Sequence, residues 1–264
     1  MNRYGIQFQV KNSPSLDPEF MPILKFNRAF LQSAKKPVSF AVERSNGQVA
    51  VCNTFIHGTP EMREADHYYA DRLVKSMLWL QGGFKVYVSG DEDVYNYLKE
   101  TFSLTGKRAF DADFMAGVYE HPFEVVFCDK VPEEKGASQA IGRHMDGCRI
   151  GFDAGGSDRK VSAVIDGESV YSEEVVWFPK TNSDPDYHYD GIVAAFKSAA
   201  EKMPRVDAVG VSSAGIYIDN RTMVASLFLK VPKDAFNEKV KDIYLRAADE
   251  ISKMVGHPVP IEVV

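Results

Sequence analysis

The chain has 264 residues, 45% of them hydrophobic and 26% charged, which is typical of a globular protein with one large domain or two ordinary ones. Its 37 acidic and 31 basic residues give a net charge of −6, which disfavours nucleic acid and favours small-molecule or protein partners. No apolar run approaches the roughly 18 residues of a membrane span, and residues 1–11 lack a signal-peptide core. Cys52, Cys128 and Cys148 are too far apart to suggest a disulfide framework or a zinc site, so we expect a reduced, cytoplasmic compartment.

The first half of the chain predicts an α/β domain behind a short extension. Residues 1–36 are interpreted as an N-terminal extension that holds a single helix at 23–33. The segments 38–44 and 48–56 flank Ser45-Asn46-Gly47, which is a strong β-hairpin signal. The elements expected next are a helix at 60–80, a strand at 84–89, a helix at 91–101 and a strand at 123–128.

The polar segment 130–146 is the best candidate for a linker, and 147–264 predicts a second domain. Two apolar runs surround a glycine-rich turn, and a third strand is expected at 173–178. The elements expected after it are a loop at 181–190, a helix at 191–202, a strand at 206–213, a helix at 236–255 ended by Gly256, and a strand at 259–264.

The glycine-rich turn carries the most specific chemistry in the sequence. Gly155 and Gly156 allow backbone N–H groups to approach an anion closely, while Ser157 and Lys160 add a hydroxyl donor and a positive charge. Asp153, at the end of the first strand, is placed to hold a hydrated Mg²⁺ beside bound phosphates. The alternative is an ordinary surface hairpin, because Gly-Gly-Ser turns are common.

The run from Asp153 to Lys160, Asp-x-Gly-Gly-Ser-x-x-Lys, resembles the first phosphate motif of the actin-like ATPase and sugar kinase superfamily. It is not a Walker-type loop, since no Gly-Lys-Ser/Thr opens a helix. The order β-β-β-α-β-α-β matches the half-domain of that superfamily. The resemblance implies an α/β fold, a ribonuclease-H-like (actin-like ATPase) lobe with a mixed sheet at 147–264, preceded by a second α/β domain. It also implies ATP and Mg²⁺ as cofactors.

A second segment, from Val209 to Asp219, resembles the ROK group (repressors, open reading frames and sugar kinases). There, Gly-x-x-x-x-Gly-x-Val/Ile-Asp ends a central strand near the sugar pocket. The resemblance implies that Ser213, Gly215 and Asp219 contact a sugar. The alternative is that the small residues only allow tight packing after a buried strand.

Residues 37–129 repeat part of the later element order, with Phe40 to Ser45 in the place of the phosphate turn but without its Asp or its paired glycines. One hypothesis is a degenerate second lobe, and the alternative is an unrelated α/β domain.

Two further groups have structural alternatives. Asp184, Asp186, His188 and Asp190 alternate within one segment, but their spacing matches no known metal site and favours a solvated loop. Trp79, together with Tyr68, Tyr69 and Met77 at helical spacings, is interpreted as core rather than as a stacking platform.

In ROK kinases the general base is an Asp in an Asn-Asp pair that follows a Gly-x-Pro-Val/Ile segment. Gly256 to Val259 resembles that approach, and the general base is expected beyond Val264, so the chain is expected to be truncated before a second lobe. The resemblance therefore implies the N-terminal part of an ATP-dependent sugar kinase, a transferase that is inactive as this fragment. The alternative is a non-catalytic regulatory protein that senses a sugar or nucleotide. A homodimer is compatible with both.

Overall fold

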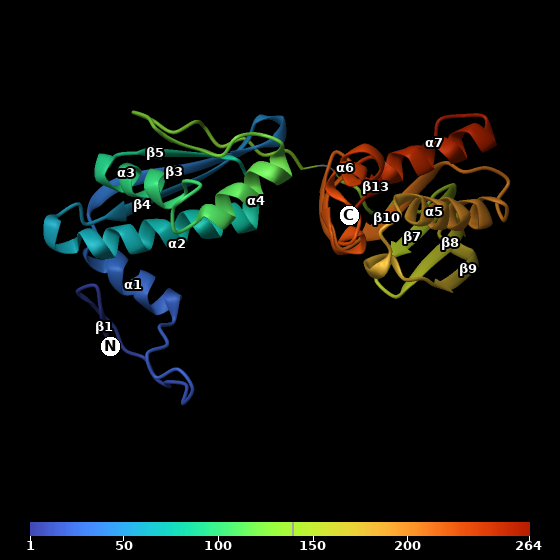
Figure 1. Ribbon diagram of the computed structural model, residues 1–264. Coiled ribbons are helices and arrows are strands. Elements are labelled where there is room, and N and C mark those ends of the chain that lie inside the picture. The colour runs from blue at the N-terminus through green and yellow to red at the C-terminus, as the bar shows by residue number, and fades with distance from the viewer. Residues whose placement is uncertain (139) are drawn as a thin grey trace. The chain divides into compact units, whose positions relative to one another are not determined.

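The computed structural model describes residues 1–138 and 140–264, which divide into two compact units, Met1–Ser138 and Gln139–Val264 (Figure 1). Each unit has its own sheet and its own hydrophobic core. None of the described helices combines the length and the apolarity that a membrane crossing requires.

The first unit contains a four-stranded sheet of order β4-β3-β5-β6. The predicted hairpin is confirmed, because β3 pairs antiparallel with β4 and its turn places Asn46 and Gly47 at φ of 61° and 62°. On its other side β3 pairs antiparallel with β5, which pairs parallel with β6. The strands are β3 (Lys36–Arg44), β4 (Gln48–Ile56), β5 (Lys85–Ser89) and β6 (Glu124–Phe127).

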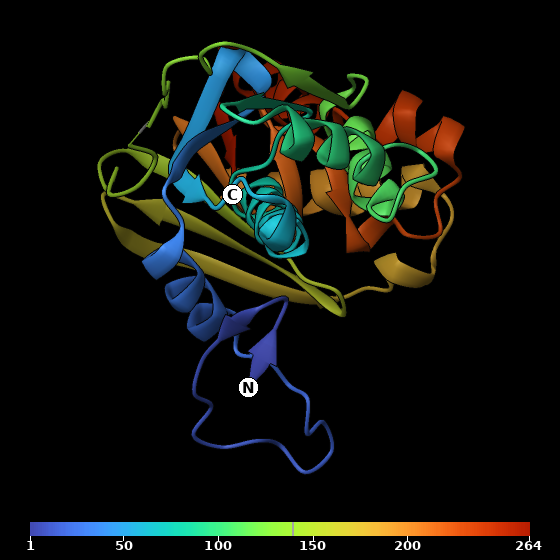
Figure 2. The same ribbon diagram turned by 90° about the vertical axis from the view of Figure 1, so that its left-hand side faces the viewer.

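Helices cover one face of this sheet. Phe40 and Val42 of β3 point into a core with Phe26, Phe30 and Leu78. The helices are α1 (Ile23–Ser33), α2 (Arg63–Gln81), α3 (Glu92–Thr101) and α4 (Ala109–Tyr119), of which α4 was not predicted. The small ribbon of β1 (Asn2–Arg3) and β2 (Ile6–Gln7) lies beside α1 (Figure 2). The aromatic cluster on α2 is only partly core, because Tyr69 is 5% exposed whereas Trp79 is 44% exposed.

The second unit contains a five-stranded mixed sheet of order β13-β10-β7-β8-β9. Strands β7, β8 and β9 form an antiparallel meander, and β10 pairs parallel with both β7 and β13. A meander whose first strand is extended on its other side by parallel strands is the ribonuclease-H-like arrangement, so the predicted fold class is confirmed. The strands are β7 (Cys148–Ala154), β8 (Asp158–Ile165), β9 (Glu168–Val176), β10 (Ala208–Ser213) and β13 (Ile261–Val263).

The strand directions bear on the two hypotheses for residues 37–129. In the second unit the strand that opens the hairpin, β7, runs parallel to β10. In the first unit the corresponding strand, β3, runs antiparallel to β5. A shared order of elements therefore does not extend to shared strand direction, which favours the alternative of an unrelated α/β domain.

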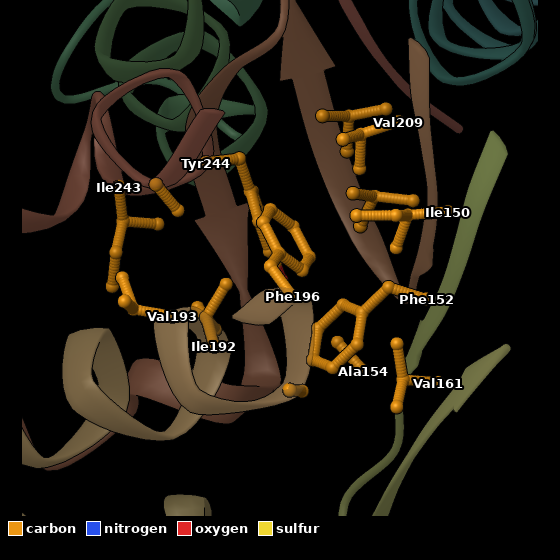
Figure 3. Packing of buried hydrophobic residues seen from close by; sticks show 14 of the residues in the cluster. Ile150, Phe152, Ala154, Val161, Ile192, Val193, Phe196, Val209, Ile243 and Tyr244 are labelled. Atoms are coloured by element: carbon orange, nitrogen blue, oxygen red, sulfur yellow. The ribbon is translucent and has the colours of Figure 1, made fainter. Parts of the chain in front are cut away.

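The two faces of the second sheet differ in chemistry because successive side chains of a strand point to opposite faces. Ile150, Phe152 and Ala154 of β7 pack against α5 (Pro185–Ala200), with α7 (Ile243–Val255) contributing Tyr244 (Figure 3). The alternate residues Gly151 and Asp153 lie on the opposite face. The covered face thus supplies the core, and the other face presents small and polar groups.

The predicted loop at 181–190 is wrong in its second half. Helix α5 begins at Pro185, a residue favoured in the first helical turn, and the Asp184 carboxylate accepts a hydrogen bond from the Asp186 N–H. His188 is consequently a buried helical residue and not part of a solvated loop, since its exposed fraction is 0%.

The predicted helix at 236–255 divides into a π-helical turn at Phe236–Val240 and α7, which ends at Gly256 with φ 79° as expected. The short helix α6 (Lys233–Ala235) precedes that turn. The hairpin of β11 (Gly215–Ile218) and β12 (Arg221–Ala225) was not predicted.

Candidate functional site

The structure brings the predicted phosphate-site residues together on the hairpin of β7 and β8. Asp153 and Lys160 are direct cross-strand partners, and both are exposed. Gly155, Gly156 and Ser157 form the connection between the strands. These residues therefore share one end of the sheet.

Trp177, directly after β9, fixes the conformation of this turn. Its indole Nε1 donates a 2.8 Å hydrogen bond to the Gly155 carbonyl, and its backbone N–H donates a 3.1 Å bond to the Ser157 carbonyl. Because a trans peptide is planar, its C=O and N–H point in opposite directions. The Gly156 N–H consequently points away from Trp177.

The turn also has backbone donors that are not used inside the protein. Within residues 1–138 and 140–264, neither the Gly156 nor the Ser157 N–H donates a hydrogen bond. Adjacent free N–H groups in a tight turn form a concave, electropositive feature that suits an anion. The arrangement therefore fits a phosphate oxygen better than an ordinary closed hairpin would.

The two glycines are required for different reasons. A Cβ on Gly155 would lie 2.5 Å from the Asp158 backbone carbonyl oxygen, which cannot move without distorting the strand. A Cβ on Gly156 would lie 2.5 Å from Lys180 Cε and 2.6 Å from Lys180 Nζ. Gly155 thus allows the backbone to close, and Gly156 leaves space for a lysine side chain.

The charges around the turn are only partly compensated. Lys160 Nζ lies 2.8 Å from Asp158 Oδ1 and 4.0 Å from Glu174 Oε1. The hydrogen bond from Lys160 lowers the pKa of Asp158 below its ordinary value and raises the pKa of Lys160. Arg159 lies over the Trp177 ring at 5.6 Å, and its buried Nε has no hydrogen-bond partner among the described residues. The hairpin end is therefore rich in cations, but Lys160 is already paired with a carboxylate.

Asp153 faces an open cleft of about 390 Å³ on the polar face of the sheet. Its neighbour across the parallel pair is the exposed Ser212 of β10. The cleft is lined by Ile141, Gly151, Phe152, Asp153, Lys160, Val161, Ser162, Ser172, Gly210, Val211, Ser212, Glu262 and Val264.

The described residues contain no cluster of three or more His, Cys, Asp or Glu side chains arranged around a metal ion. Mg²⁺ does not require one, because it keeps several water ligands and is often bound by one or two carboxylates together with substrate phosphates. The single exposed carboxylate of Asp153, on the strand that leads into the turn, fits that mode of binding.

The predicted sugar-site residues do not converge. Ser213 is 8% exposed, and its Oγ accepts hydrogen bonds from Tyr217 at 2.7 Å and Tyr244 at 3.2 Å. Burial raises the pKa of both tyrosines, which therefore remain donors. Gly215 starts β11 directly against the Val224 carbonyl, and Asp219 is exposed in the β11–β12 turn at φ 51°. Ser213 is thus a hydrogen-bond acceptor in the core, whereas a sugar contact by Asp219 remains a prediction.

Sequence reasoning missed Trp177 and Lys180, and it placed Ser212 at the ligand-binding edge of the sheet without assigning it to the site. Of the two neighbouring serines, the assignment chose Ser213, whereas the period-2 alternation of strands could have selected Ser212 as the exposed one. Trp177 and Lys180 lie more than 15 residues after the turn in sequence. No local signal indicated that they return to it.

No known family signature matches the sequence, and no curated protein matches it. Among solved structures, the chain is similar to a glucokinase from Parabacteroides distasonis, with 17% identity over 47% of this chain and 32% of that one and a TM-score of 0.32. It is also similar to a ROK hexokinase from Thermus thermophilus, with 16% identity over 44% and 35% of the two chains and a TM-score of 0.30. A third similar structure is RuvC from T. thermophilus in complex with a Holliday junction, with 18% identity over 44% and 64% and a TM-score of 0.28.

The chain spans about a third of the length of the two kinase structures, 32% and 35%. Its second unit has the ribonuclease-H-like arrangement that the sequence motif implied, as the strand order shows.

Proposed function

We propose that the second unit is the nucleotide-phosphate-binding lobe of a ROK-like, ATP-dependent sugar kinase, which transfers a phosphoryl group to a sugar hydroxyl. The observation that carries this proposal is the turn at Gly155 to Ser157, whose Gly156 and Ser157 N–H groups donate no hydrogen bond within the described residues and which joins the strand ends that carry Asp153 and Lys160. We assign no catalytic base to this chain. Phosphoryl transfer is therefore proposed for the protein completed by a second lobe, and the chain alone is proposed to bind without turnover.

Each residue of the hairpin has a distinct proposed role. The Gly156 and Ser157 N–H groups and the Ser157 hydroxyl would donate to phosphate oxygens, and Lys160 would add positive charge. Asp153 would hold Mg²⁺, which when bound neutralises charge on the phosphate oxygens. On the sugar side we retain Gly215 and Asp219. The Ser213 hydroxyl is already an acceptor for Tyr217 and Tyr244.

The proposal is tested by calorimetric titration of Mg-ATP into the full chain. Asp153→Asn should weaken binding by about tenfold or more, because a metal ligand carboxylate loses its charge. The control is Glu168→Gln, an exposed carboxylate at the start of β9, far along the strands from the turn. It should bind Mg-ATP like the unmodified chain. Equal binding by Asp153→Asn, or no binding by the unmodified chain, would contradict the proposal.

The same titrations distinguish the regulatory alternative. A sugar or nucleotide sensor of this fold would bind its ligand, but joining the chain to a second lobe would not create ATP turnover. If a hexose binds and Asp219→Asn removes that binding while Mg-ATP does not bind, the sensing function is favoured over the kinase.

A further inference from the structure

We infer that the Lys180 side chain binds the phosphate chain of a ligand held at the hairpin turn. This inference rests on the proposed function. Lys180 follows β9 within the short 3-10 helix Pro179–Thr181, and its side chain is exposed. Its ammonium group occupies the space that any side chain at position 156 would need. An exposed cation thus lies directly against the glycine whose N–H donates no hydrogen bond within the described residues.

The segment that carries Lys180 is held in place on both sides. On one side, Trp177 is 1% exposed and is hydrogen-bonded to the Gly155 and Ser157 carbonyls. On the other side, Pro179 is buried and its carbonyl lies 3.0 Å from Nε2 of the buried His188. The backbone at Lys180 is therefore fixed relative to the turn, although its side chain reaches into solvent.

His188 connects this anchor to the rest of the unit. Its Nδ1 lies 2.8 Å from the Asp184 carbonyl, and its Nε2 also lies 3.2 Å from the Leu227 carbonyl. One imidazole thus ties the start of α5 and the segment after β12 to the lysine-bearing turn. The buried histidine is therefore a positioning residue for three backbone segments.

The electrostatic balance of the turn assigns Lys180 a specific role. Lys160 is paired with Asp158, so an anion at the turn must compete with a carboxylate for that cation. Lys180 Nζ has no hydrogen bond and no ion pair within the described part of the chain. A lysine ammonium is a compact point charge without a preferred geometry, so it can follow a flexible phosphate chain.

The ligand chemistry that fits is a linear chain of phosphates, whether carried by a nucleotide or by inorganic polyphosphate. The contact is with the phosphates and not with a base or ribose. Lys180 should therefore contribute equally to both ligands, and its contribution should fall as salt concentration rises.

The test is a set of titrations of the full chain with Mg-ATP and with Mg-tripolyphosphate at low and high salt. Lys180→Gln should weaken binding of both ligands about tenfold at low salt. Lys180→Arg should restore most of the affinity because it keeps the charge. The matched control is Lys230→Gln, which removes an equally exposed lysine with no ion pair among the described residues.

The outcomes separate this inference from the proposed function. If the unmodified chain binds neither ligand, the proposed function fails. If it binds and Lys180→Gln binds equally well, only the role of Lys180 is overturned. A loss confined to ATP would also overturn it, because it would place the lysine on the nucleoside rather than on the phosphates.

Discussion

Each unit contains one β-hairpin that opens its main sheet in sequence, β3–β4 and β7–β8, and the turns of the two hairpins satisfy the backbone in opposite ways. In the first, the Gln48 N–H donates to the Ser45 carbonyl, so the turn closes on itself. In the second, the carbonyls of Gly155 and Ser157 are held by Trp177 from outside the turn. The first turn therefore needs two residues in the left-handed backbone conformation, Asn46 and Gly47, whereas the second needs Trp177 to hold its carbonyl groups.

This difference shows how an ordinary hairpin acquires free donors. A turn that bonds to itself consumes its polar groups, whereas a turn held from outside can expose them. Substitutions in the residues that distinguish the two turns test this difference.

Truncating Trp177 should have the largest effect. Trp177→Ala removes a fully buried indole and should reduce the free energy of unfolding of the second unit by about 3–5 kcal/mol. Trp177→Phe keeps most of the packing but loses the bond to Gly155, so it should cost about 1–2 kcal/mol and weaken Mg-ATP binding. Denaturant unfolding and calorimetry measure the two effects. Full Mg-ATP affinity in Trp177→Phe would show that the indole does not hold the turn open.

Adding a methyl group to one glycine in each turn should separate packing from binding. In Gly155→Ala the added methyl group would clash with the Asp158 carbonyl, which should lower the free energy of unfolding by about 1–3 kcal/mol. The same change should weaken Mg-ATP binding. Gly47→Ala, at φ 62°, should cost about 1 kcal/mol through backbone strain and leave Mg-ATP affinity unchanged. Thermal unfolding and titration of both variants test this. Loss of binding in Gly47→Ala would contradict a site confined to the second turn.

Releasing Lys160 from its carboxylate should strengthen anion binding. Asp158→Asn removes the partner of Lys160 and should improve Mg-ATP affinity about threefold.

The same ion pair affects the pH dependence of stability, because the Lys160 ammonium holds the pKa of Asp158 below its ordinary value. The stability contributed by this pair is therefore present above that ordinary pKa and is lost as the pH falls through the lowered one.

An NMR titration of the Asp158 carboxyl group checks the assignment of that pair. In Lys160→Gln its pKa should rise toward the ordinary value of an aspartate. An unchanged pKa would mean that Lys160 does not cause the lowered pKa of Asp158. An unchanged Mg-ATP affinity in Asp158→Asn would mean that the Asp158 carboxylate and the ATP phosphates do not compete for Lys160.

Local patterns predicted most of what is local in this structure. The Asn-Gly turn, the glycine after α7 and the glycine-rich hairpin each depend on residues adjacent in sequence. The order of elements also sufficed for the fold of the second unit, because an antiparallel meander followed by helix and strand restricts the sheet to few topologies.

What could not be predicted depends on distant contacts. Polar residues at 184–190 indicate a loop until His188 is seen to lie among three carbonyl groups from separate segments. Lys180 is an ordinary surface lysine until the chain folds back to Gly156. Ser213 and Asp219 share a motif in sequence, yet one is in the core and the other is exposed.

The smallest effect is expected from a lysine in the first unit that resembles Lys180. Lys135 Nζ lies 3.7 Å from the position that a Cβ on Gly47 would occupy, so this turn also has a cation against a glycine. Its Gln48 N–H, however, is bonded to the Ser45 carbonyl. If a phosphate site needs free N–H groups as well as a cation, Lys135→Gln should leave Mg-ATP and Mg-tripolyphosphate affinity unchanged while Lys180→Gln lowers both. Equal losses in the two variants would mean that the chain attracts phosphates through diffuse charge alone, and the open turn would then have no special role.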